Sequence, residues 1–514
     1  MNPLVPILPL RLFGTCGPLL GACQIHHESD RMRPANFLYI ISDQHNKHAL
    51  GCYGHPVVQT PNLDRLAERG TRFDNAYTNC PICVPVRASL ATGRYVHQAG
   101  YWDNGHPYDG RVNSWHHRLR EQGFHIDSIG KLHFSGPQND HGFTNEVEPL
   151  HVVDGVGDVL GCIRDERAPV RKKRVGILDA GPGESTYLQY DVRNGDNGVA
   201  WLNEHKDDEK PWALFLSFVC PHPPYICPQK FFDQYIDQHI PFQPQWRESD
   251  WPQHPALDYM RRFFDFDPQF TEAQIKQMIA AYLGACSHLD EQIGRVLDEL
   301  DKLGLVDSTR VIYTSDHGEH QGARGVWGKF SMFEESAGIP FIAAGPDIPA
   351  AEVRKTPISL VDTFPTAVEC VGASLSDSDG DLPGGSIWSI ANEPDQDRTI
   401  FSEYHAVGSR HASYMVRDLT HKYVHYAHEP AQLYDMVSDP DELTDLASTE
   451  SDRVDHFERR LREICDPIEQ DRRAKDDQAT KIDEFGGVET VLNRGAFDNS
   501  PVPGEKPAFR NHRA

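Results

Sequence analysis

The stretch Phe37-Leu38-Tyr39-Ile40-Ile41, followed at once by Ser42-Asp43-Gln44-His45, decides the fold of this chain. Five consecutive apolar residues predict a β-strand that is covered on both faces, as strands of parallel sheets are. The polar residues after Ile41 mark the end of that strand. Further strands are predicted at residues 125–129, 213–219, 310–314 and 340–344.

A long helix is predicted between the second and third of these later segments, 213–219 and 310–314. Thr271 and Gln274 have the spacing of a capping box at its start, and Gly304 is typical of a residue that ends a helix. Apolar residues recur along it with helical spacing, at Ile275, Ile279, Leu283, Cys286, Leu289, Ile293, Val296 and Leu300. Strands that alternate with helices predict an α/β fold with a mostly parallel central sheet and helices on both faces.

The organisation beyond this sheet is predicted from changes in composition. Residues 376–385 are polar and rich in glycine, as linkers are, and short strand patterns follow at 400–403, 414–417 and 422–425. We therefore expect a large domain at 34–385 and a smaller α+β domain with an antiparallel sheet at 386–450. Residues 451–514 are expected to form one charged helix and a tail that is either disordered or bridges subunits, which favours a homo-oligomer.

Charge and cysteine content restrict the class of protein. The chain has 514 residues and a formal net charge of −26, which argues against nucleic acid as a partner because phosphates would be repelled. A small anionic substrate remains compatible with a local pocket of Lys, Arg and His. The eleven cysteines are odd in number and irregularly spaced, which does not indicate a disulfide framework and suits a reducing cytoplasm.

The first 33 residues are interpreted as a disordered leader, with Met32 as a plausible true start. Leu19-Leu20-Gly21-Ala22-Cys23 faintly resembles a lipoprotein cleavage site, but no positive charge precedes Arg11. No run of about 18 apolar residues occurs, so no membrane-spanning helix is expected. A cytoplasmic location is the prediction, and export to the periplasm or as a lipoprotein is the alternative.

Unusual polar residues follow four of the predicted strands. Ligands of open α/β sheets bind beyond the carboxyl ends of the strands, so these residues are expected to meet at one edge and form an active site. They are Asp43 after the first strand, Lys131 and His133 after the second, His222 after the third, and Asp316 and His317 after the fourth.

Three of these side chains suit a divalent metal ion. Asp43 and Asp316 offer hard oxygen ligands, and His317 offers one imidazole. A site with mostly oxygen donors favours Ca²⁺, Mg²⁺ or Mn²⁺ over structural zinc.

The segment Cys83-Val84-Pro85-Val86-Arg87, which continues to Thr92-Gly93-Arg94, resembles the signature of the sulfatase family. Other segments resemble the family in the same order, over roughly residues 36 to 450. They are Gly130-Lys131-Leu132-His133, Pro221-His222-Pro223-Pro224, Ser315-Asp316-His317-Gly318, Lys329 before Phe330, and Leu433-Tyr434-Asp435 with Asp439-Pro440-Asp441-Glu442. Leu50-Gly51-Cys52-Tyr53-Gly54-His55 and Phe401-Ser402-Glu403-Tyr404-His405 are most similar to choline-sulfatase-like members.

This resemblance implies an alkaline-phosphatase-like α/β/α sandwich and the hydrolysis of a small-molecule sulfate ester to an alcohol or phenol and sulfate. It further implies that a separate formylglycine-generating enzyme oxidises Cys83 to formylglycine (3-oxoalanine). One hydroxyl of hydrated formylglycine then attacks sulfur, and the other expels sulfate. One divalent ion, Ca²⁺ before Mn²⁺ or Mg²⁺, is expected to be held by Asp43, Gln44, Cys83, Asp316 and His317.

The resemblance also implies roles for the remaining polar residues. Arg87, one helical turn after Cys83, would steady the formylglycine and the metal ligands. His133, beside Lys131 and facing the same cleft, would deprotonate the second hydroxyl. His222 and Lys329 would bind sulfate oxygens and protonate the leaving group, and Asn104 would add a hydrogen bond to the substrate.

Three alternatives remain open at this point. A phosphonate monoester or phosphodiester hydrolase also uses formylglycine, but such enzymes tend to carry hydroxyl side chains at the positions of Lys131 and His133. A two-metal phosphatase needs a Ser or Thr nucleophile and further ligands, which we cannot assemble here. A non-enzymatic binding protein would have lost a ligand or the nucleophile, whereas every expected position is filled.

The signature motif has one departure from the family pattern. Val86 stands directly before Arg87, where most sulfatases carry serine.

The alcohol part of the ester is not identified by the sequence. Four aromatic residues are candidates for a pocket that binds an aryl or quaternary ammonium group, and a place in the core is the commoner fate of tryptophan. They are Tyr101, Trp102, Trp201 and Trp327.

Overall fold

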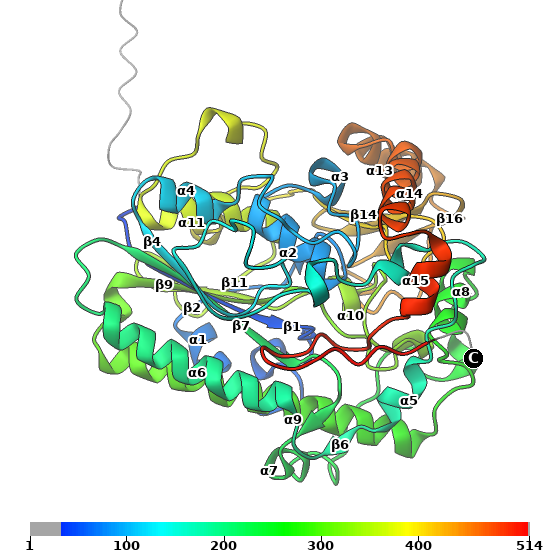
Figure 1. The fold of residues 1–514 in the computed structure, drawn as a ribbon, viewed down its shortest axis with the longest axis horizontal. Helices are drawn as coiled ribbons and strands as arrows, with labels where there is room; N and C mark the ends of the chain where they lie inside the picture. Colours follow the sequence, from blue (N-terminus) through cyan, green and yellow to red (C-terminus); the bar gives the residue numbers. More distant parts are fainter. Residues whose placement is uncertain (1–31, 512–514) are drawn as a thin grey trace, which may run out of the picture.

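The computed structural model describes residues 32–511 and centres on an eight-stranded sheet (Figure 1). The strand order is β11-β2-β10-β9-β1-β7-β4-β5. Strands β9, β1, β7, β4 and β5 run parallel to one another, whereas β10 is antiparallel to both β9 and β2. The strands are β1 (Asn36–Asp43), β2 (Gly70–Phe73), β4 (His125–Lys131), β5 (Asn145–Leu150), β7 (Trp212–Pro221), β9 (Thr309–Ser315), β10 (Phe341–Ala344) and β11 (Glu352–Arg354).

Helices cover both faces of this sheet. Figure 1 shows α6 and α9 on one face and α2, α4 and α11 on the other. The five predicted strands and the α/β fold class are thereby confirmed. The helices of this layer arrangement are α1 (Pro61–Glu68), α2 (Cys83–Thr92), α4 (Trp115–Glu121), α6 (Thr186–His205), α9 (Glu272–Lys302) and α11 (Thr363–Val371).

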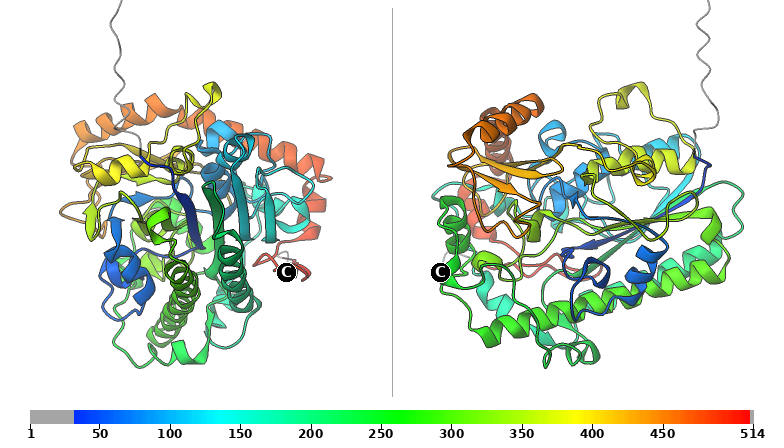
Figure 2. Two further views of the ribbon diagram at one scale, coloured as in Figure 1. Left: turned by 90° about the vertical axis from the view of Figure 1, so that its left-hand side faces the viewer. Right: turned by 180° about the vertical axis from the view of Figure 1, so that it is seen from behind.

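Helix α9 is the long helix that the sequence predicts, and Figure 2 shows it in green along one face of the sheet. Thr271 and Gln274 form the predicted capping box, and Gly304 follows the helix in a left-handed conformation (φ 71°). All eight residues of the predicted apolar seam are buried. The seam packs on sheet residues such as Leu38 and Leu216 and holds the helix in place.

The smaller sheet near the C-terminus is antiparallel, as predicted. It consists of β13 (Ile400–Tyr404), β14 (Ser413–Arg417), β15 (His421–Tyr426) and β16 (Glu429–Asp435), in that order. Residues 376–385, predicted as a linker, have ordered contacts with the large domain. Both carboxylate oxygens of Asp379 accept hydrogen bonds from Arg118, and Asp381 binds Arg94.

The prediction of a single helix after residue 450 is wrong. Three helices follow, α13 (Ser451–Ile464), α14 (Pro467–Glu484) and α15 (Val488–Arg494). The chain breaks between the first two because Asp466 caps α14 with its carboxylate and Pro467 occupies the first position of that helix. Residues 488–494 then form a further helix after Gly486 and Gly487, which both have positive φ.

Residues 495–511 form a segment that packs on its own chain. The backbones of Ala496 and Arg510 pair through two hydrogen bonds, and the Tyr187 hydroxyl donates to the carbonyl of Ser500 at 2.6 Å. Val502 is buried beside Leu150. Figure 1 shows this C-terminal segment in red. The predicted subunit-bridging role and the homo-oligomer stay predictions.

The sequence also led to predictions about a leader segment, membrane-spanning helices and disulfides. The predicted leader and the Leu19–Cys23 segment lie outside the described residues. Within residues 32–511, no helix is both long enough and apolar enough to cross a membrane. The nine cysteines in that range form no disulfide with one another.

We predict that Leu289→Ala lowers the free energy of unfolding by about 2–5 kcal/mol, because Leu289 is fully buried between α9 and the sheet and its loss leaves a cavity. Denaturant unfolding followed by circular dichroism measures this change. The control is Asp298→Ala on the exposed side of α9, which is expected to change the free energy by less than about 0.5 kcal/mol. An equal effect of the two substitutions would contradict the packing described here.

Candidate active site

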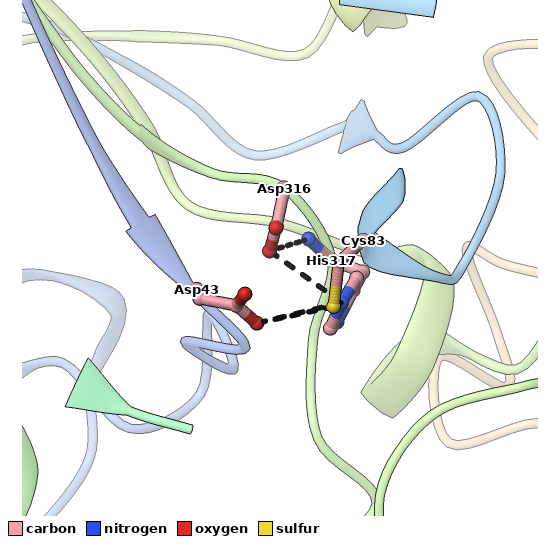
Figure 3. A group of neighbouring side chains, drawn as sticks. All are labelled: Asp43, Cys83, Asp316 and His317. Atoms are coloured by element: carbon pink, nitrogen blue, oxygen red, sulfur yellow. Dashed lines mark hydrogen bonds and ion pairs between the residues drawn. The ribbon is translucent and has the colours of Figure 1, made fainter. Parts of the chain in front are cut away.

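The carboxyl ends of four sheet strands bring the predicted polar residues to one edge. Asp43 ends β1, Lys131 ends β4, and Asp316 follows β9 directly, so strand register alone places these side chains together. Cys83, the first residue of α2, points into the same place (Figure 3). Its Sγ lies 3.1 Å from Nε2 of His317 and 3.6 Å from a carboxylate oxygen of Asp43.

The Cys83 thiol is not suited to attack a substrate as a thiolate. Its burial, together with the neighbouring Asp43 carboxylate, raises the pKa of Cys83 to about 11. At neutral pH the side chain is therefore a protonated thiol, which is a weak nucleophile. Lys329 and Lys131 act in the opposite direction, but burial and Asp43 outweigh them.

A divalent metal ion fits the donor atoms at this edge. One ligand atom from each of Asp43, Cys83, Asp316 and His317 lies within 4.8 Å of every other. Burial opposes ionisation of Asp43, yet Lys131 and other cations hold its pKa well below the ordinary value, so the carboxylate is charged. Burial lowers the pKa of His317 to about 4, which leaves the imidazole neutral.

The orientation of His317 and Gln44 agrees with such a role. Nδ1 of His317 lies 3.1 Å from the carbonyl oxygen of Gly318, which leaves Nε2 facing Cys83 as a lone-pair donor. The side-chain oxygen of Gln44 accepts a hydrogen bond from Lys329 at 2.6 Å, and its amide donates to Glu319. Both the oxygen and the nitrogen of the Gln44 amide are thus held. Lys329, which binds the oxygen, also contacts Cys83.

Arg87 connects the strand ends to one another. Its Nε donates to Asp316 at 2.9 Å, and its Nη1 donates to the carbonyl of Lys131 at 2.8 Å and to the Ser217 hydroxyl at 3.0 Å. Its other terminal nitrogen is 3.9 Å from Asp43. Arg87 lies one turn after Cys83 on α2, as predicted, and is only 2 % exposed.

Two lysines complete the charge balance around Cys83. Lys131 forms an ion pair with Asp43, and the Lys329 ammonium lies 3.2 Å from Cys83 Sγ. Burial opposes the charge on Lys329, but Cys83, Asp43 and Asp316 raise its pKa, so the ammonium remains protonated. With Arg87, three buried cations therefore surround two carboxylates, and the site favours an anionic ligand.

His133, His222 and Asn104 line the pocket above Cys83, as predicted. His133 has a positive φ of 55°, so the chain leaves the extended conformation of β4 at this residue. Within residues 32–511, neither ring nitrogen of His133 has a hydrogen-bond partner, and burial holds its pKa well below the ordinary value. His222 is neutral for the same reason, and its Nδ1 lies 2.7 Å from the Pro223 carbonyl oxygen.

The pocket has a volume of about 390 Å³ and contains walls that sequence reasoning missed. Of the four aromatic candidates, Trp327 lines it, whereas Trp102 packs against His405 and Trp201 packs against Trp212. The additional lining comes from Phe264, Phe266 and Phe330, from Arg171 and Lys173, and from the C-terminal segment through Phe497, Asp498, Asn499, Ser500, Ala508 and Arg510.

Glu319 is a further residue that sequence reasoning missed. It is fully buried, binds the Gln44 amide, and accepts hydrogen bonds from the backbone of Gln321 and Gly328. Its place three residues after Asp316 was a signal, because an acidic residue that closely follows a strand end lies near the ligand edge of the sheet.

Comparisons with known proteins agree with this geometry. The family model described as Sulfatase matches residues 35–373, and a model of the C-terminal part of N-sulphoglucosamine sulphohydrolase matches residues 318–467. A choline-sulfatase of Rhizobium meliloti is 32 % identical over 441 residues, which covers 82 % of this chain and 84 % of that protein. Arylsulfatase K of Bos taurus is 29 % identical, covering 84 % of this chain and 81 % of that protein.

A solved structure of similar fold is the phosphonate monoester hydrolase of Agrobacterium radiobacter. It superposes with a TM-score of 0.68 at 25 % identity, covering 83 % of this chain and 94 % of that chain. The match of the Sulfatase model extends over well over half of the sequence and includes Cys83, both lysines and all the candidate metal ligands. The chain therefore belongs to the sulfatase family.

Proposed function

We propose that this enzyme hydrolyses a sulfate ester to an alcohol or phenol and inorganic sulfate, with formylglycine at position 83 and one divalent metal ion. The observation that carries the proposal is the position of Cys83 Sγ, 3.1 Å from His317 and 3.2 Å from Lys329, at the floor of a pocket lined by His133 and His222. The residues 34–385 form the catalytic domain in this proposal, and residues 386–450 form its smaller companion.

Formylglycine explains why a buried, neutral thiol stands where a nucleophile is needed. When hydrated, it supplies two hydroxyls on one carbon, of which one attacks sulfur and the other allows sulfate to leave. Every residue of α2, Cys83 to Thr92, is buried. A separate formylglycine-generating enzyme must therefore act on this segment before the chain has folded.

Asp43, Gln44, Asp316, His317 and the side chain at position 83 would hold the metal ion, for which we propose Ca²⁺ because oxygen donors predominate. When bound, the ion supplies positive charge at the sulfate oxygens and lowers the pKa of the nucleophile. Arg87 keeps Asp316 oriented through its 2.9 Å hydrogen bond and prevents the strand ends from separating.

His133 is proposed as the base that removes the proton of the second hydroxyl. Because burial keeps its imidazole neutral, it can accept a proton at neutral pH, and both ring nitrogens are free of partners within the described residues. Lys131, paired with Asp43, keeps that carboxylate ionised and adds positive charge beside the reacting group.

The leaving oxygen is proposed to receive its proton from the side of Lys329 and His222. Lys329 is charged and lies beside position 83, so it can donate to an oxygen that develops negative charge. His222 is neutral and its Nδ1 donates to the Pro223 carbonyl, so Nε2 carries a lone pair and has to take up a proton before it can act with Lys329. Asn104 lines the pocket and is held by the backbone of Val84, from where it can contact the substrate.

We predict that Cys83→Ala lowers the rate of sulfate ester hydrolysis by about 10⁴-fold or more, because the side chain that attacks sulfur is lost. The control is Cys80→Ala, which removes a buried sulfur three residues away and is expected to keep the rate within about tenfold. Release of 4-nitrophenol from 4-nitrophenyl sulfate measures both rates. The mass of the tryptic peptide that contains residue 83 identifies formylglycine, and an unmodified thiol in fully active enzyme rejects the mechanism.

Replacement of a proposed metal ligand has a separate consequence. We expect Asp316→Asn to weaken Ca²⁺ binding by more than about 100-fold, since even residues that merely orient a ligand change metal affinity by about 10–100-fold. Calorimetric titration of chelator-treated enzyme with Ca²⁺, and in parallel with Mn²⁺, gives the affinities. Asp307→Asn, at an exposed carboxylate, is expected to leave them unchanged. Equal affinity of the two variants speaks against the site.

The preference between sulfate and phosphonate follows from Lys131 and His133. We expect kcat/KM for 4-nitrophenyl sulfate to exceed that for 4-nitrophenyl phenylphosphonate by about tenfold or more, because these two residues replace the hydroxyl side chains that phosphonate hydrolases tend to carry. The same leaving group in both compounds isolates the effect of the transferred group. A clear phosphonate preference would favour the alternative assignment as a phosphonate monoester or phosphodiester hydrolase.

A further inference from the structure

Two cationic side chains at the outer part of the pocket have no part in the proposed chemistry. Lys173 is the first residue of α5 (Lys173–Leu178), and Arg510 belongs to the C-terminal segment. They are more than 300 positions apart in the chain, yet both line the pocket that has Cys83 at its floor. Lys173 and Arg510 come close to each other because residues 495–511 pack against the rest of the same chain.

The carboxylate between these two cations balances only one of them. Asp498 lies 2.9 Å from Arg510 and 3.7 Å from Lys173, and within the described part of the chain it is the sole carboxylate within 4 Å of the Lys173 ammonium. The neighbouring Arg171 differs, because both carboxylate oxygens of Asp158 accept hydrogen bonds from it. Lys173, Arg510 and Asp498 together therefore carry one unbalanced positive charge.

The surroundings of Lys173 favour an incoming anion. Burial lowers the pKa of Lys173, Asp498 and Asp158 oppose this shift, and Arg171 and Lys329 add to it. Lys329, one of these two cations, also contacts Cys83. Arg510 is 57 % exposed, and an exposed ion pair such as Arg510 with Asp498 is readily exchanged for a ligand.

Three acidic residues line the pocket, of which Asp158 pairs with Arg171 and Asp498 pairs with Arg510. Asp179, which follows α5, also lines the pocket and is exposed. It stands six positions after Lys173, so about 9 Å of helix separates the two backbones and their charges do not cancel locally. In a chain with a net charge of −26, a positive group at the mouth of the pocket selects strongly by charge.

Part of the pocket lining is apolar. Phe264 and Phe330 stack with ring centroids 4.3 Å apart, and Trp327 lines the same pocket. Such a wall can hold the carbon skeleton of a substrate but does not by itself favour a quaternary ammonium group, because Lys173, Arg510 and Lys329 would repel it.

We propose that the substrate carries, in addition to the sulfate that is hydrolysed, a second anionic group that binds Lys173 and Arg510. A carboxylate and a sulfonate or second sulfate share the required chemistry. This inference rests on the proposed sulfate ester hydrolysis and adds the substrate class to it. The carbon skeleton of this substrate lies against Phe264, Trp327 and Phe330, and its second anionic group lies toward the C-terminal segment.

Four phenyl sulfates test the inference with the full-length enzyme. They carry at the meta position a carboxymethyl, a sulfomethyl, a carbamoylmethyl or a trimethylammoniomethyl group, and the methylene keeps the acidity of the phenol leaving groups similar. We expect kcat/KM for at least one of the two anionic compounds to exceed that for the neutral amide by about tenfold, mainly through KM. The cationic compound is expected to be the poorest substrate. The better anion identifies the chemistry of the second group.

The variant Lys173→Ala/Arg510→Ala is expected to abolish this preference while it retains turnover of the neutral amide, which shows that the fold and the chemistry are intact. The matched control is Lys172→Ala/Lys506→Ala, which removes the same charge from exposed neighbours outside the pocket lining and keeps the preference. Equal kcat/KM for anionic and neutral compounds, preference for the cation, or an unchanged preference in the first variant overturns the inference alone. Absence of turnover with all four compounds overturns the proposed function and the inference together.

Discussion

The guanidinium group of Arg87 is the constraint on which the active site depends. It donates to Asp316 after β9, to the carbonyl of Lys131 at the end of β4 and to Ser217 on β7, and it lies near Asp43 at the end of β1. Four strands are thereby tied to α2 by one side chain that is almost fully buried. A buried arginine of this kind is costly to desolvate, and it is tolerated because each of these contacts compensates part of that cost. Because Cys83 lies one turn before Arg87, the same contacts fix Cys83 relative to Asp43 and Asp316.

The centre of the molecule could be predicted from the sequence because its determinants are local. An apolar run such as Phe37–Ile41 indicates a buried strand, and parallel strands have their carboxyl ends at one edge, so Asp43, Lys131 and Asp316 had to converge. The capped helix α9 was predictable for the same reason, since Thr271, Gln274 and the apolar seam act within a few residues of one another. The backbone at His133 was not predictable, because its positive φ arises where the chain turns out of β4 toward Leu150.

The outer pocket could not be predicted, because it is assembled by tertiary packing without a local pattern. The charged composition after residue 450 predicted a single helix and a tail. In the structure, Asp466 and Pro467 start a new helix. Residues 495–511 then return to the mouth of the pocket. Two contacts anchor that return, the Tyr187 hydroxyl on the Ser500 carbonyl and the burial of Val502. Neither the spacing nor the composition of the sequence indicates these two contacts. Lys173 and Phe264 were missed for the same reason, since each lies in a stretch whose role appears only when the chain is folded.

In the proposed function, the residues at the floor of the pocket carry out the chemistry, and the residues at its mouth select the substrate. The residues at its floor are held by the sheet and by Arg87, so a change there disturbs several strand ends at once. The residues at its mouth belong to the short helix α5 and to the C-terminal segment, neither of which is part of the sheet. A substitution at Lys173 or Arg510 can therefore alter the charge that a substrate meets without moving Cys83, Asp43 or His317. Because a surface ion pair contributes little to stability, the charge at the mouth can be changed at small cost to the fold. It follows that, under the proposed function, changes at Lys173 and Arg510 alter substrate selection while the sulfatase signature around Cys83 stays the same.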